Sequence, residues 1–220
     1  MGTFAADRDL LVYEPNIFRD VGWVGQRLVK GTGTISGTTL TLSAQDVPFD
    51  AAGVTTGSVV TVAGTAYEVM SRLSATSLQI SRLREDSPSG MSTAVITPSP
   101  ATAQECIVMT FVPQLSSAHR QILRLAGLDP DEPTPSGAPT QASIANSASL
   151  RRLECLGALA LIWWAAAGLM GDGSAAAERG EWYRRRFETE RARVNIKLDT
   201  NADGLPDATR RLSAGWMRRG

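Results

Sequence analysis

An acidic stretch near the C-terminal end has the residue types and the spacing of half a calcium-binding loop. In DTNADGLPD, residues 199–207, side-chain oxygens recur at alternate positions and a glycine follows the third of them, a pattern that wraps a loop around a hard cation. The twelfth position should supply a bidentate carboxylate, but Arg210 stands there. The favoured interpretation is a turn built on Asx side chains, with Asp207 capping a last helix from Ala208 to about Trp216. A cation site is the alternative that the sequence leaves open.

The other residues with catalytic potential form no recognisable motif. His119 is the one histidine and has no Ser or Cys nucleophile motif around it, so we expect a partly exposed helix residue rather than a general base. No CxxC, HExxH or GxSxG pattern occurs, and the glycines of residues 31–37 lack the Lys-Ser/Thr of a phosphate loop. Asp7 and Asp9 have no related second acidic cluster. We therefore predict no enzymatic activity and no cofactor.

Composition points to a folded protein without a strong charge bias. The apolar share of 43% and the charged share of 20% are ordinary for globular domains. The formal net charge is zero, so bulk charge does not attract the chain to nucleic acid or to an anionic membrane. Cys106 and Cys155 lie far apart among apolar neighbours, which indicates reduced core residues of an intracellular protein. The N-terminus lacks the basic and apolar regions of a secretory signal.

The first half of the chain predicts short helices followed by strands. Residues 4–29 have helical apolar spacing in two pieces, broken around Glu14-Pro15-Asn16. From Gly31 onward, Val- and Thr-rich segments punctuated by glycine predict an antiparallel barrel or sandwich. Residues 85–103 are rich in Ser, Pro and Thr and predict a surface linker with one short strand at Ala94–Thr97.

The predicted fold is α+β, a helical bundle with long C-terminal helices and an inserted small antiparallel β-barrel or sandwich. The bundle comprises N-terminal helices in residues 1–29 and a main part in residues 104–198. The β module covers residues 30–84 and the linker residues 85–103. Residues 199–220 form the acidic turn and a C-terminal tail.

A long uncharged helix is expected in the C-terminal half. It starts at about Leu150, capped by Ser149, and its run from Cys155 to Met170 has no charge. At 1.5 Å per residue this run spans roughly 24 Å, short of the ~30 Å hydrocarbon core of a membrane. We expect burial in the protein's own core or against neighbouring subunits. The adjacent Trp163 and Trp164 point about 100° apart on a helix, which favours a partner facing at least one of them.

A second helix is expected from Ser174 to Leu198. Glutamates and arginines four residues apart along it indicate a solvated face with balanced charges. The alternative is that Arg184-Arg185-Arg186 contacts DNA phosphates or an acidic partner, although the interleaved glutamates would weaken such a stripe. The candidate subunit-interface residues on the two helices are Trp163, Trp164, Tyr183 and Phe187.

The last residues, RRLSAGWMRRG, place arginines around apolar side chains. Trp and Arg dominate interface hot spots, so this composition predicts a docking peptide, with a tail frayed into solvent as the alternative. The candidate docking residues are Arg210, Arg211, Leu212, Trp216, Met217, Arg218 and Arg219.

The order of these segments resembles that of tailed-bacteriophage head-to-tail connector proteins, the adaptor subunits beneath the portal. The segments concerned are ADRDLLVYEPNIFRDV, a helical middle, EWYRRRFETERARV, DTNADGLPD and the Arg-rich tail. The helical parts of the chain carry the resemblance, and the β module would be an insertion.

The resemblance implies a ring of subunits in the neck of the virion, assembled in the host cytoplasm and twelve-fold to match the portal. Packaged DNA would pass through its channel without sequence specificity, and no membrane would be involved. Residues 208–220 would dock onto the portal protein, and stopper or tail proteins would bind on the other side.

Two other functions remain open. One is a related ring, either a stopper or a tail terminator. The other is a small β-barrel that binds nucleic acid, but residues 30–84 contain few of the basic and aromatic residues that contact phosphates and stack on bases.

Overall fold

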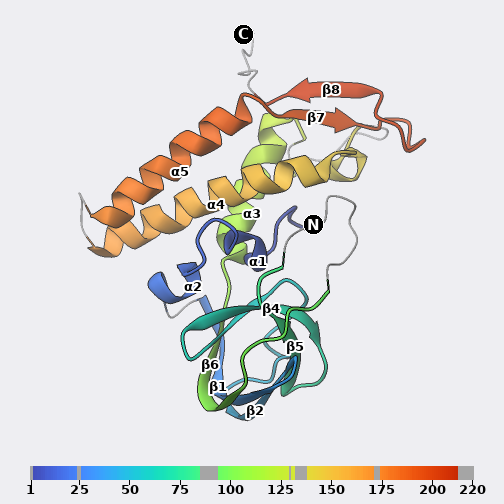
Figure 1. Cartoon of the computed structure of the whole chain (residues 1–220). Coiled ribbons are helices and arrows are strands. Elements are labelled where there is room, and N and C mark those ends of the chain that lie inside the picture. The colour runs from blue at the N-terminus through green and yellow to red at the C-terminus, as the bar shows by residue number, and fades with distance from the viewer. Residues whose placement is uncertain are drawn as a thin grey trace. The chain divides into compact units, whose positions relative to one another are not determined.

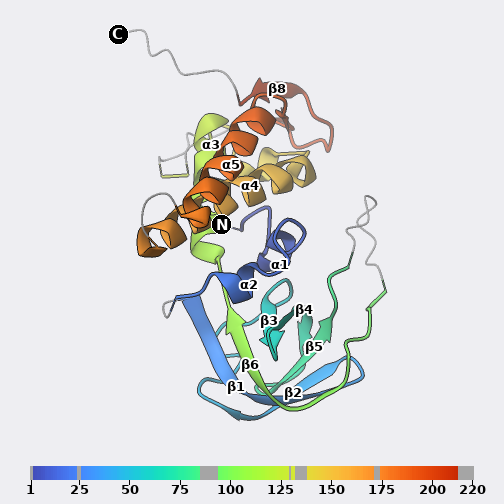
Figure 2. The ribbon, with the colours of Figure 1, turned by 60° about the vertical axis from the view of Figure 1, so that its left-hand side comes forward.

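Six antiparallel strands close a barrel in the first half of the computed structural model, which describes residues 2–23, 26–84, 94–128, 130–131, 138–170 and 174–212. The strands follow one another around the barrel in the order β1-β2-β5-β4-β3-β6, and β6 returns to β1 (Figure 2). Their bounds are β1 Arg27–Ser36, β2 Thr39–Gln45, β3 Val59–Val62, β4 Thr65–Arg72, β5 Ser77–Ser81 and β6 Ala101–Met109.

The barrel forms because its strands alternate or are wholly apolar and its turns contain residues that tolerate positive φ. β2 alternates buried and exposed positions at its start, whereas every residue of β3 is buried. The tight β3–β4 turn has Ala63 at φ 49° and Gly64 at φ 78°, the left-handed pair that two-residue hairpins require. The interior is filled by Val29, Ile35, Leu40, Leu42, Phe49, Val54, Val60, Val62, Tyr67, Val69, Leu78, Ile80, Cys106 and Val108.

The barrel extends beyond the predicted limits at both ends. β1 starts at Arg27, and β6 begins in the last three residues of the predicted linker and continues into residues expected to belong to the helical bundle. β6 pairs with β1 along its length and with β3 over Cys106–Met109, so this strand closes the barrel. The predicted strand at Ala94–Thr97 is wrong, since those residues are in no strand. The first half of β6 is exposed and polar, which is why its sequence is typical of a linker.

Two short helices, α1 (Asp7–Leu10) and α2 (Ile17–Asp20), precede the barrel. The predicted break around residues 14–16 is confirmed, but the helices are shorter than predicted and residues 27–29 belong to β1. These helices belong to the same compact unit as the barrel, residues Ala6–Val112, and not to the helical part of the chain. We call this the barrel unit.

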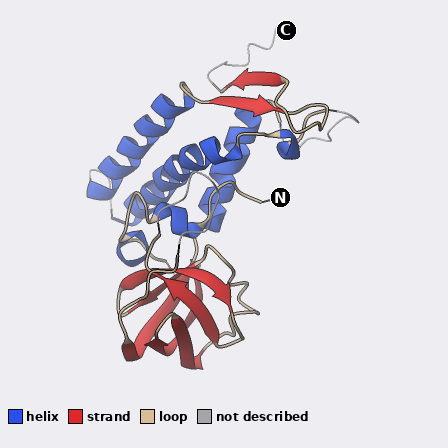
Figure 3. Ribbon diagram, turned by 45° about the vertical axis from the view of Figure 1, so that its right-hand side comes forward, coloured by secondary structure: helices blue, strands red, loops and turns tan. Residues whose placement is uncertain are grey.

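The second compact unit comprises Met1–Ala5 and Pro113–Gly220, and we call it the helical unit. Its elements are α3 (Val112–Leu125, in this unit from Pro113), the 3-10 turn η2 (Gln141–Ser143), α4 (Ser147–Met170), α5 (Ala175–Arg191), β7 (Asn195–Leu198) and β8 (Ala208–Arg211). α5 runs back beside α4, and β7 pairs with β8 as a hairpin (Figures 1 and 3).

Small residues let the helices of this unit approach closely. A Cβ on Gly157 of α4 would lie 3.1 Å from the Ala118 Cβ of α3 and 3.2 Å from the Phe187 ring of α5. A larger side chain at this position would push the helices apart.

One expected helix is shorter in the structure, and another is a strand. α5 ends at Arg191, and residues 195–198 form β7 rather than its last turn. The helix predicted from Ala208 is wrong, because Ala208–Arg211 is β8. Backbone pairing between β7 and β8 overrides the local helical preference of these charged residues.

By length and composition α4 could cross a membrane, but 67% of its most apolar window is buried inside the protein. A core helix of a folded domain has these same properties.

Candidate interaction surface

An apolar face on the second half of α4 lies open to solvent. Leu161, Trp164, Ala165, Gly168 and Leu169 recur at intervals of three and four, so they share one side of the helix. All five are exposed, with Leu161 at 40%, Trp164 at 47% and Leu169 at 75%. We call this set the α4 face.

The same side of α4 is covered along its first half. Leu150, Glu154 and Ala158 lie on that side and are fully buried. Contacts with α3 reach this half of the helix, through Glu154 to His119 and through Gly157 to Ala118. The side of α4 that is core in its first half is therefore bare in its second half.

Of the four predicted interface residues, three are buried and one is exposed. Trp163, Tyr183 and Phe187 are 5%, 2% and 4% exposed, buried by the chain itself. Of the four, only Trp164 retains a large exposed area, although it also packs over Gly180 of α5, where a Cβ would lie 3.1 Å from its ring. Leu161, Leu169 and Trp182 were missed, although the three- and four-residue spacing of the α4 face was present in the sequence.

A second exposed tryptophan, Trp182, lies on α5 with 50% exposure. The Arg186 guanidinium lies 4.5 Å from its ring centroid, and the Tyr183 ring meets it edge-on. Arg179 stacks in the same way over Trp163, at 4.8 Å. These cation–π contacts hold arginine side chains against the aromatic surface of the helices.

The arginine triplet of α5 is largely paired within the helix. Glu181 accepts hydrogen bonds from Arg184 at 2.8 Å and from Arg185 at 2.9 Å, and these bonds lower the pKa of Glu181 to about 2. This part of α5 is the expected solvated face with balanced charges. Arg186, as described, lies on Trp182 instead.

The candidate docking tail is described only at its beginning. Arg210 donates to the carbonyls of Ala126 and Gly127 just after α3, at 2.7 and 3.1 Å, and Leu212 is 1% exposed. Both residues therefore stabilise the helical unit itself, and of the three only Arg211 is exposed. The other candidates, Trp216, Met217, Arg218 and Arg219, lie outside the described residues.

The acidic loop between β7 and β8 uses its oxygens to hold its own backbone. Asp199 accepts from the Gly204 amide and Asp203 from the Leu205 amide, both at 2.8 Å. Asp207 caps no helix; its carboxylate accepts from the Thr200 hydroxyl and amide, which lowers its pKa. In the described part of the chain, no three His, Cys, Asp or Glu side chains are grouped to hold a metal ion. The loop is an Asx-rich turn.

His119 is not the partly exposed residue that we expected. It is 3% exposed and lies between Glu154 and Gln141, with Nδ1 2.9 Å from the Glu154 carboxylate and Nε2 3.1 Å from the Gln141 Oε1. Gln141 in turn donates to the Gly2 carbonyl through Nε2, which identifies its other atom as the oxygen.

Both partners of His119 offer acceptor oxygens to the ring nitrogens, an arrangement that favours the protonated imidazole. Burial opposes the charge and would lower the pKa of His119, but the bonds from Glu154 and Gln141, together with the Glu154 charge, raise it above its ordinary value. A protonated imidazole with both nitrogens occupied is unsuited to act as a general base. Its role is to hold the structure together.

A pocket of about 570 Å³ lies beside this network, between the N-terminal segment, η2 and the start of α4. Phe4, Gln141 and Arg151 are among its walls. The Arg151 Nε donates to the Phe4 carbonyl at 3.3 Å, and the Phe4 ring lies 4.5 Å from the imidazole of His119. These side chains anchor the N-terminal segment to the helical unit.

No protein-family model, curated protein or solved structure matches this chain.

Proposed function

We propose that the protein is a structural ring subunit, an adaptor in the head-to-tail connector of a tailed bacteriophage. The α4 face is the observation that carries the ring part of the proposal, because it is apolar and bare in a helix whose same side is core one turn earlier. The connector part rests on the order of segments in the sequence.

A second copy of the chain is the proposed occupant of the α4 face. Fully burying an exposed Leu side chain is favourable by about 1.5–3 kcal/mol, and Leu161, Trp164 and Leu169 lie together there with 40%, 47% and 75% of their surface still exposed. Among the described residues, no heavy atom beyond the neighbouring helix backbone lies within 4 Å of a Cβ built on Gly168. The backbone of another helix could therefore approach closely. In a ring the contact is heterologous, and the α4 face meets a different surface of the next copy.

In this proposal α3, α4 and α5 form the helical bundle with long C-terminal helices, and the barrel is an insertion. The ring is twelve-fold, lies in the virion neck between portal and tail proteins, and passes DNA without sequence specificity. Docking onto the portal would involve Arg211 and the residues after Leu212, because Arg210 and Leu212 are used within the helical unit.

The charge of the barrel unit does not favour the nucleic-acid-binding alternative. Residues 6–112 contain seven Lys or Arg and ten Asp or Glu residues. A net negative module repels the phosphate backbone, whose attraction supplies most non-specific affinity.

The test is the mass of the assembled protein, by native mass spectrometry with negative-stain imaging of its shape, alone and with portal rings. We expect a closed ring for the wild type and its loss in Leu169→Glu. The matched control is Trp182→Glu, an equally polar change at an exposed α5 residue, which should leave the ring intact. A wild-type chain that remains monomeric alone and with portal rings would overturn the proposal. Assembly on tail tubes but not on portals would favour a tail terminator.

A further inference from the structure

The chain passes twice between its two units, at Ala5–Ala6 and at Val112–Pro113. Two covalent connections restrict relative motion more than one does, provided that each unit holds both of its connecting segments firmly. The contacts inside each unit decide whether this is the case.

In the barrel unit, the Asp7 carboxylate joins the two segments. Asp7 is 3% exposed in the first turn of α1, and its Oδ1 accepts the backbone N–H of Phe111 at 2.8 Å. The Thr110 side chain also bonds to this carboxylate. Asp7, just after the Ala5–Ala6 connection, therefore holds the backbone of Phe111, just before the Val112–Pro113 connection.

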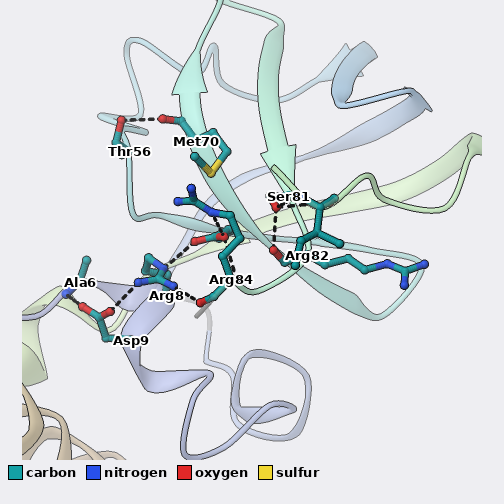
Figure 4. A network of polar contacts seen from close by, with 10 residues as sticks. Ala6, Arg8, Asp9, Thr56, Met70, Ser81, Arg82 and Arg84 are labelled. Atoms are coloured by element: carbon teal, nitrogen blue, oxygen red, sulfur yellow. Dashed lines mark hydrogen bonds and ion pairs between the residues drawn. The ribbon is translucent and has the colours of Figure 1, made fainter. Parts of the chain in front are cut away.

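The helix that carries Asp7 is itself fixed to the barrel. The Arg8 amide donates to the Gly57 carbonyl at 3.0 Å, and the Arg8 guanidinium lies 2.5 Å from the buried Glu68 carboxylate. Arg84 donates to the other oxygen of Glu68 at 2.6 Å, and its carbonyl accepts from Arg8 (Figure 4). Asp9 accepts the Ala6 amide at 2.8 Å. The backbone that carries Asp7 is therefore held to the barrel by hydrogen bonds and ion pairs.

In the helical unit, the Glu154 carboxylate has the corresponding position. It is fully buried on α4 and accepts the backbone N–H groups of Phe4 and Ala5 at 3.1 and 3.2 Å. The same carboxylate pairs with His119 of α3, the helix that follows the second connection. Glu154 therefore joins the end of the first segment to the start of the other.

We propose that the double connection is a clamped hinge, in which Asp7 in the barrel unit and Glu154 in the helical unit each tie together the two segments that leave that unit. Relative motion of the units is then confined to the few backbone torsions at Ala5–Ala6 and at the start of α3, around Val112. The inference uses contacts within each unit and is independent of the proposed connector function.

The cost of burying the Asp7 carboxylate supports a role beyond simple stability. Burial raises the pKa of Asp7 to about 6 against the opposing hydrogen bonds of Phe111 and Thr110, and the neighbouring Asp9 charge raises it further. An ionised carboxylate at such a site is retained at a cost in folding free energy. An amide or an apolar residue would avoid that cost.

The hinge is tested with spin labels on the full chain, at Ala44→Cys in the barrel unit and Ala175→Cys in the helical unit, both exposed. The native Cys106 and Cys155 are buried and free of disulfide bonds. Asp7→Leu, which has no acceptor, should broaden the distance distribution between the labels. Asp7→Asn keeps an acceptor oxygen and should leave it as narrow as in the wild type. Asp50→Leu, at an exposed carboxylate, is the matched control and should change nothing.

Hydrogen exchange on the unaltered protein gives an independent test if Asp7→Leu does not fold. The amides of Phe4, Ala5 and Phe111 should all be protected, since each donates to a clamp carboxylate. Unprotected amides would overturn the proposal, and so would an Asp7→Leu distribution identical to that of the wild type in a folded protein.

Discussion

The barrel unit pairs its strand edges and fills its own interior, whereas the helical unit leaves part of an apolar helix face exposed. β6 pairs with both β1 and β3, so the barrel has no free strand edge among its six strands, and its interior is filled by its own side chains. α4 is covered along one half of a side and bare along the other. The difference follows from backbone chemistry. A sheet must pair its edge groups or leave them open, whereas a helix satisfies its own backbone and can leave a side chain face for a partner.

The largest effect should come from emptying the barrel. Phe49 is fully buried, so Phe49→Ala should lower the free energy of unfolding by about 3–5 kcal/mol through lost burial and a residual cavity. Urea unfolding followed by circular dichroism measures this. Leu169→Ala on the α4 face should change the unfolding of the isolated chain by less than about 0.5 kcal/mol. Equal losses of unfolding free energy in Phe49→Ala and Leu169→Ala would show that the α4 face is as much a part of the folded core as the barrel interior.

Breaking the buried pair of the helical unit should have the next largest effect. His119→Leu leaves the Glu154 carboxylate buried without its cation, and such a change costs about 3–5 kcal/mol. Because the folded pKa of His119 is raised, its stabilisation is full below the ordinary value near 6.5 and is lost as pH rises through the higher folded value.

Urea unfolding across the pH range, followed by a probe in the helical unit, checks this dependence. The wild type should lose stability on the alkaline side, whereas His119→Leu should lack this loss. A parallel decline in both proteins would show that His119 is not the titrating group.

Replacing Asp7 by Asn should stabilise the barrel unit above neutral pH. The folded pKa is about 6, against an ordinary value of 3.8, so the stability contributed by protonated Asp7 is lost as pH rises toward and through 6. At pH 8 Asp7→Asn should be more stable by roughly 1–3 kcal/mol, since each pKa unit corresponds to about 1.4 kcal/mol. Near pH 3.5 the two proteins should have similar stabilities, and a constant gain at both pH values would contradict the assignment.

The smallest effect is expected on the exposed face of α5. Glu181→Gln removes the negative charge that pairs with Arg184 and Arg185 at a solvated site, so thermal unfolding should be unchanged, as is common for exposed ion pairs. The Glu181 carboxyl should titrate near pH 2 in the wild type, as followed by side-chain NMR. In Arg184→Ala/Arg185→Ala its pKa should return toward the ordinary value, and an unchanged titration would rule out the arginines as the cause.

Local patterns predicted the elements better than their boundaries. The strands from Gly31 to Ser81 and the uncharged helix around Trp163 follow from period-two and helical spacing. β6 escaped prediction because its first half is polar and exposed, and only the partners β1 and β3 make it a strand. The β7–β8 hairpin also escaped prediction, because the apolar alternation of β7 covers only four residues and β8 contains no large apolar residue.

The surface residues show the same division. The sequence alone determined that α4 carries more apolar surface than an ordinary solvated helix and that the charges of α5 nearly balance, and it favoured an Asx turn at 199–207, because composition and spacing are local properties. Only the tertiary structure decided that Trp163 is core while Leu161, Trp164 and Leu169 are bare, and that His119, Glu154 and Asp7 join distant backbone segments. Burial and pairing between residues far apart in the chain depend on which elements pack together, and local spacing does not contain that information.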